Sequence, residues 1–99
     1  MVADDWLDQH TSRAPAALRQ RVGEYAAAAT EASRVTALAA AAQAALGRVL
    51  SHPGDRSAAL DLLAADALIT LALQSQAEAA PEQLEEFAIS VLRPARPGV

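Results

Sequence analysis

The amino-acid sequence predicts an all-α fold, a small antiparallel helical bundle with four main helices and a short N-terminal helix. Alanine, the strongest helix former, is the commonest residue, and apolar residues make up 53% of the chain. Larger apolar side chains recur at spacings of three and four, and no segment shows the alternation of a β-strand. The clearest turn signal is Pro53-Gly54, between two such helical stretches.

The chain has 99 residues, which corresponds to one domain. We assign residues 1–93 to this domain and residues 94–99, which hold two prolines and a glycine, to a flexible C-terminal tail. A domain of this size buries only roughly 60–70% of the surface that its unfolded chain exposes. Self-association is therefore an expectation from size alone.

The first helix is expected over residues 4–10, because Asp4 and Asp5 suit the positive end of a helix dipole. The second starts at Pro15, since proline is tolerated in a first turn. Its core-facing stripe consists of Leu18, Val22, Tyr25 and Ala29. Gly23 lies inside this helix at a cost of about 1 kcal/mol. We expect a close approach by a neighbouring backbone to compensate for it.

A turn is predicted at residues 30–33, with Thr30 or Ser33 as the cap of the third helix. The stripe of the second helix does not continue in register into the strong stripe that follows, which is Val35, Leu38, Ala42, Leu46 and Val49. The alternative is one long helix over residues 15–50, because no proline or glycine forces a stop.

The third helix is expected over residues 34–51 and has a back face of small residues, Ala37, Ala40, Ala41, Ala44 and Gly47. Such a face either meets water or packs closely against another alanine-rich helix. Asp55 is a good cap for a fourth helix over residues 56–79. Pro81 begins the fifth, whose buried face is Leu84, Phe87, Ala88, Val91 and Leu92.

Residues 58–73, AALDLLAADALITLAL, are apolar on nearly every side of a helix, which is typical of a buried central helix. Between Leu62 and Leu73 the only polar side chains are Asp66 and Thr70, one turn apart. They are a candidate polar handle in the core, of the kind that binding and active sites use. Two structural interpretations are favoured over it: this is the least buried side of the helix, or Asp66 pairs with an arginine or a hydrogen-bond donor.

The sequence lacks the motifs that identify several classes of function. The net charge of −4 and the scattered arginines argue against a nucleic-acid partner. The chain has no cysteine, no HExxH spacing, no nucleophile elbow and no glycine-rich phosphate loop. We therefore assign no catalytic, cofactor-binding or metal-binding residue and expect no cofactor and no enzymatic activity. A helix that spans a bilayer needs about 20 residues, and the longest uncharged run, residues 35–47, is shorter than that. We therefore expect a cytoplasmic protein.

The segment LLAADALITLA, residues 62–72, resembles one helix of the all-helical prenyl diphosphate synthases. Those enzymes hold magnesium and diphosphate through two DDxxD motifs. The present chain matches that motif once, in DDWLD at residues 4–8, and has no second copy. Both matches are explained by composition, the first by that of a buried helix and the second by that of a helix start. We therefore transfer no activity from these enzymes.

The sequence thus predicts a small interaction protein that acts through apolar helix faces, with a homodimer as the expected assembly. The candidate interface residues are Trp6, Leu7, Ala37, Ala41 and Ala44. For Trp6 and Leu7, packing on the protein's own core is the favoured interpretation, and insertion of the DDWLD segment into another protein is the alternative. Two other functions stay open: a bundle that binds an apolar small molecule with Asp66 and Thr70 as its polar handle, and an enzyme that uses Asp66.

Overall fold

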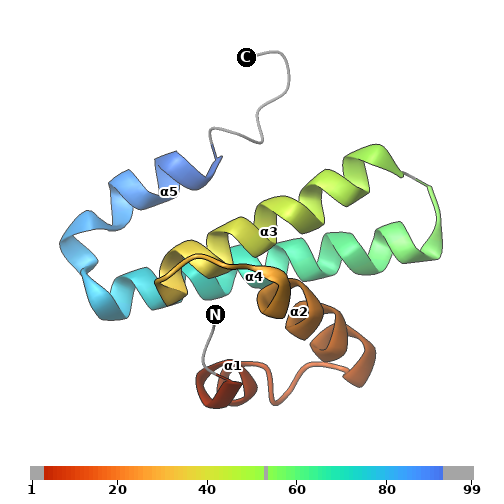
Figure 1. Ribbon diagram of the computed structural model, residues 1–99, viewed down its shortest axis with the longest axis horizontal. Coiled ribbons are helices and arrows are strands. Elements are labelled where there is room, and N and C mark those ends of the chain that lie inside the picture. The colour runs from red at the N-terminus through yellow and green to blue at the C-terminus, as the bar shows by residue number, and fades with distance from the viewer. Residues whose placement is uncertain (1–3, 53, 93–99) are drawn as a thin grey trace.

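Two long helices, α3 (Arg34–Ser51) and α4 (Arg56–Ala79), lie side by side as an antiparallel hairpin in the computed structural model, which describes residues 4–52 and 54–92 (Figure 1). Helix α2 (Ala16–Ala28) crosses this hairpin at a steep angle, and the short α1 (Asp4–His10) lies beyond it (Figure 1). A 3-10 turn, η1 (Pro81–Gln83), reverses the chain into α5 (Leu84–Leu92). The predicted all-α bundle is confirmed, with α2 crossing the hairpin rather than running along it.

Local capping chemistry sets the helix boundaries. Ser33 accepts a hydrogen bond from the backbone N–H of Thr36 at 3.2 Å and so starts α3. Asp55 accepts one from the backbone N–H of Ala58 at 2.7 Å and starts α4. Because α2 ends at Ala28, the break at residues 30–33 is confirmed and the single long helix is wrong. The predicted tail, residues 94–99, lies outside the described residues.

Helix α4 is the central element of the fold. It packs along α3 for most of its length and also contacts α2, η1 and α5. The largest side chains that are fully buried are Val22 of α2, Leu38 of α3 and Leu68 of α4. Alanines fill most of the remaining core, so the three helices approach closely. Each aliphatic side chain at this centre therefore carries a large share of the hydrophobic stabilisation.

Only part of the small-residue face of α3 is buried in the fold, because Ala44 and Gly47 are exposed. Ala37 and Ala41 are 0% and 2% exposed, respectively. The fold therefore buries these two alanines, which agrees with the close-packing alternative raised for this face. In contrast, the expectation for Gly23 is wrong, because no atom of a neighbouring element lies within 4 Å of the position that a Cβ would occupy.

Helix α4 is also long and apolar enough to cross a membrane, judged by length and composition alone. The core helix of a soluble bundle meets the same criterion. The face of α4 that packs on α3 and α2 is buried in the fold, whereas its opposite face is open.

Candidate functional site

The open side of α4 is the most unusual surface of the described structure. At about 100° of rotation per residue, six exposed residues between positions 56 and 70 fall within one arc of about 120°. We call them the outer face of α4: Arg56, Ala59, Leu62, Leu63, Asp66 and Thr70. Leu62 is 51% and Leu63 54% exposed, although both belong to the helix at the centre of the core. The helix predicted to be the buried central one therefore meets water along one stripe.

The candidate polar handle does not lie in the core, because Asp66 and Thr70 are both exposed. The Thr70 hydroxyl donates to the backbone carbonyl oxygen of Asp66 at 3.0 Å, a bond within the helix that leaves the carboxylate uninvolved. Of the alternatives considered, the first holds: this is the least buried side of α4. Helix α3 and α2 occupy the opposite side, so no neighbour covers these two residues.

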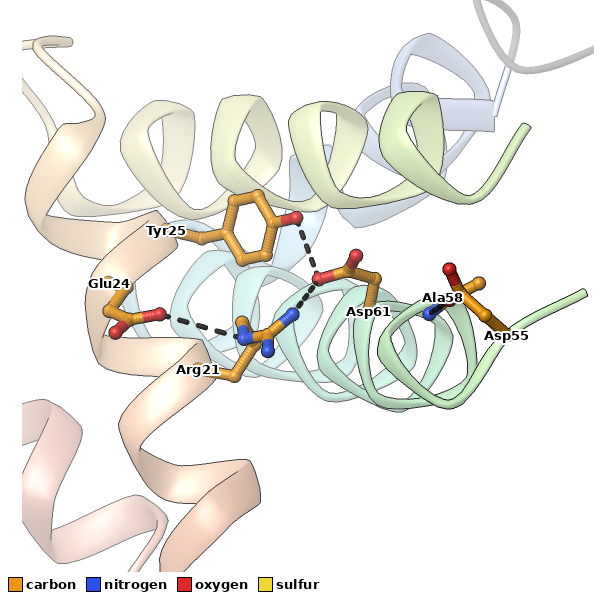
Figure 2. Close-up of polar contacts among 6 residues, drawn as sticks. All are labelled: Arg21, Glu24, Tyr25, Asp55, Ala58 and Asp61. Carbon is orange, nitrogen blue, oxygen red and sulfur yellow. Dashed lines mark hydrogen bonds and ion pairs between the residues drawn. The ribbon is translucent and has the colours of Figure 1, made fainter. Parts of the chain in front are cut away.

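Among the residues whose burial the structure describes, the buried acid is Asp61, five residues earlier and only 3% exposed. Its Oδ1 accepts a hydrogen bond from Arg21 Nη1 at 2.5 Å and another from the Tyr25 hydroxyl at 2.9 Å (Figure 2). Glu24 lies on the outer side of the same guanidinium, with its Oε1 at 3.6 Å from Arg21 Nε (Figure 2). This cluster ties α2 to α4 where the two helices cross.

The cluster stabilises the charged form of Asp61. Burial alone raises the pKa of its carboxyl, but the hydrogen bonds from Arg21 and Tyr25, together with the charges of Arg21 and Arg48, outweigh burial and bring the pKa below its ordinary value. Burial and the hydrogen bond to Asp61 raise the pKa of the Tyr25 hydroxyl. The hydrogen bond to Asp61 likewise raises the pKa of Arg21. The group is therefore an ion pair that joins two helices.

Sequence reasoning did not single out this cluster. Arg21 belongs to scattered arginines that suggest a solvated surface, and Asp61 differs from Asp66 only by its position on the helix. One signal was present: Arg21 and Tyr25 are one turn apart on α2, so both can reach the same partner.

The N-terminal helix is held against the bundle by its aromatic residue. The indole N–H of Trp6 donates to Glu78 Oε1 at 3.2 Å. The His10 ring stacks on Trp6 with 4.0 Å between the ring centroids, and the Arg34 guanidinium lies 4.5 Å from the Trp6 ring. Trp6 is half-buried against the core cluster, and Leu7 is 8% exposed.

The candidate interface residues therefore have different outcomes. Leu7, Ala37 and Ala41 are buried in the protein's own core, so they do not form an exposed interface. For Leu7 and for Trp6, which also packs on the bundle, this agrees with the favoured interpretation. Ala44 remains exposed and lines an open cleft of about 210 Å³ between α2 and α3.

A second open cleft, of about 330 Å³, lies beside the ion pair and is lined by Arg21, Glu24, Tyr25, Ala28, Arg48 and Ser57. Neither cleft includes Asp66 or Thr70. Within residues 4–52 and 54–92, no three His, Cys, Asp or Glu residues converge in a way that would hold a metal ion.

No protein-family model, curated protein or solved structure matches the chain.

Proposed function

We propose that the protein acts by binding rather than by catalysis, as a small helical interaction protein that associates with a second copy of itself through the outer face of α4. One observation carries the proposal: two leucines of the central core helix, Leu62 and Leu63, are about half exposed. Adjacent large apolar side chains that remain open to water are typical of an interaction site. A cytoplasmic location is part of the same proposal.

The exposed area sets the strength of the association. Each leucine retains about half of its surface, and covering that half contributes about 0.8–1.5 kcal/mol. A symmetric contact covers four such side chains and therefore contributes about 3–6 kcal/mol. The cost of association starts at about 4 kcal/mol. The leucines therefore leave at most about 2 kcal/mol of net association free energy. We expect the other exposed residues of the face to contribute about 2 kcal/mol more, which gives a weak dimer with a dissociation constant on the order of 1 mM.

The proposal is tested by sedimentation velocity across protein concentrations from about 10 µM to about 2 mM, which bracket the expected dissociation constant. We expect the weight-average mass to rise toward that of a dimer. A double variant, Leu62→Gln with Leu63→Gln, should stay monomeric. Its thermal stability should match that of the natural chain, because both positions are exposed.

The matched control is Ile89→Gln, which removes an apolar side chain that is 49% exposed on α5. This variant should dimerise like the natural chain. A natural chain that stays monomeric at the highest concentration refutes the proposal, and so does a dimer that survives the double leucine substitution.

Because α4 also has the length of a membrane span, flotation with phosphatidylcholine vesicles is measured in parallel. Binding to vesicles that requires Leu62 and Leu63 would assign the face to lipid instead.

A further inference from the structure

The charges on the outer face of α4 are arranged in a self-complementary way. Arg56 stands at the N-terminal end of this face and Asp66 lies ten residues later, with Ala59, Leu62 and Leu63 between them. All five residues are exposed. Within the described part of the chain, neither Arg56 nor Asp66 has an ion-pair partner. From its N-terminal end, the outer face therefore carries a positive charge, then an apolar segment, then a negative charge.

We infer that two copies pair through antiparallel α4 helices, with Arg56 of each copy opposite Asp66 of the other. This inference rests on the proposed function and adds its geometry. Arg56 and Asp66 lie five residues to either side of residue 61, about 7.5 Å along the helix axis. A two-fold axis at that level therefore brings each arginine to an aspartate, and the same operation sets Ala59 opposite Leu63.

A parallel pairing has the opposite effect. It places Arg56 beside its own equivalent and Asp66 beside its own equivalent, so that both ends repel. Each copy carries a net charge of −4, so two copies repel unless specific pairs offset that charge. The antiparallel register gives two opposite-charge pairs at the rim of the apolar contact, which fixes orientation more than it adds affinity.

The arrangement of the other helices leaves this approach open. Helix α4 packs on α3 and α2 with the opposite side of its circumference, where Asp61, Ala64, Ala65 and Leu68 are buried. A second copy that covers residues 56–66 therefore meets only the outer face. The contact is about 15 Å long at 1.5 Å per residue, which suits a small and weak interface.

Charge reversal tests the register. Arg56→Glu turns both attractive pairs of the dimer into repulsive ones, and we expect its dissociation constant to rise about tenfold or more. Asp66→Arg should weaken the dimer by a similar factor. The double variant Arg56→Glu with Asp66→Arg restores opposite charges across the axis and should return to within about threefold of the natural chain. The control Arg19→Glu changes net charge by the same amount at an exposed site on α2 and should have a much smaller effect.

Spin-label distances give an independent test, because the chain contains no cysteine. Labels are attached to Thr70→Cys and, separately, to Gln74→Cys, both exposed and beyond the contact. In the antiparallel register the α-carbon separations across the dimer are about 28 Å and about 40 Å, whereas a parallel pair gives about 10 Å at both sites.

The two failures are distinguishable. A natural chain that never dimerises overturns both the proposed function and this inference. A dimer that depends on Leu62 and Leu63 but ignores both charge reversals, or that gives equal distances at positions 70 and 74, overturns the antiparallel register alone.

Discussion

The ion pair between Asp61 and Arg21 gives a prediction with a defined pH dependence. Asp61→Asn keeps the size of the side chain and one acceptor oxygen but removes the charge. A hydrogen bond to a charged group contributes about 1.5–3 kcal/mol. The loss of one partner of a fully buried ion pair costs about 3–5 kcal/mol. The Arg21 side chain is 25% exposed and stays partly hydrated, so we expect the free energy of unfolding at pH 7 to fall by about 2–3 kcal/mol.

The sign of the pH effect follows from the lowered pKa of Asp61. A carboxyl whose pKa is lower in the folded than in the unfolded state stabilises the fold at every pH above the unfolded value, which is about 3.9. This contribution declines as the pH falls through that value toward the folded pKa. The difference in unfolding free energy between the natural chain and Asp61→Asn should therefore be constant from pH 7 to about 5 and shrink below about pH 4.

Urea denaturation followed by circular dichroism measures this difference across the pH range. The matched control is Asp66→Asn, an identical substitution on the exposed face of the same helix, which should change the unfolding free energy by less than about 0.5 kcal/mol. Two outcomes would refute the assignment of Asp61 as the buried charged partner of α2. One is an equal loss of unfolding free energy in both variants. The other is a loss in Asp61→Asn that is as large at pH 2.5 as at pH 7.

Other substitutions probe individual features of the fold. Gly23→Ala should raise the unfolding free energy by about 0.5–1 kcal/mol, because a Cβ meets open space there; a decrease in denaturant melts would contradict this. Asp55→Ala removes the cap of α4 and should cost about 1 kcal/mol in the same assay, with Asp55→Asn as the tolerated control. Leu38→Ala should cost about 2–5 kcal/mol at a site that is 0% exposed. Leu50→Ala, 68% exposed, should lower the thermal midpoint far less, and similar losses would contradict the burial of Leu38.

The helix boundaries were predictable because their causes are local. Ser33 and Asp55 each bond a backbone N–H three residues further on, and such a contact depends only on the residues at the helix start. The residue ranges of α1, α3 and α4 follow from caps and apolar spacing in the same way. The position of α4 at the centre of the bundle was also predictable, because a helix apolar on most sides needs several neighbours.

The side of α4 that stays open was not predictable, because apolar side chains surround most of this helix and its periodicity does not indicate which side meets water. The choice is made by α3 and α2, which pack over one side and leave Leu62, Leu63 and Asp66 exposed. The same packing decides between the two aspartates. Asp61 lies where α2 crosses and meets Arg21 and Tyr25, whereas Asp66 is rotated about 140° around the helix and faces away from α2. A contact between residues 21 and 61 depends on how the chain folds back on itself, and local patterns carry no information about that distance.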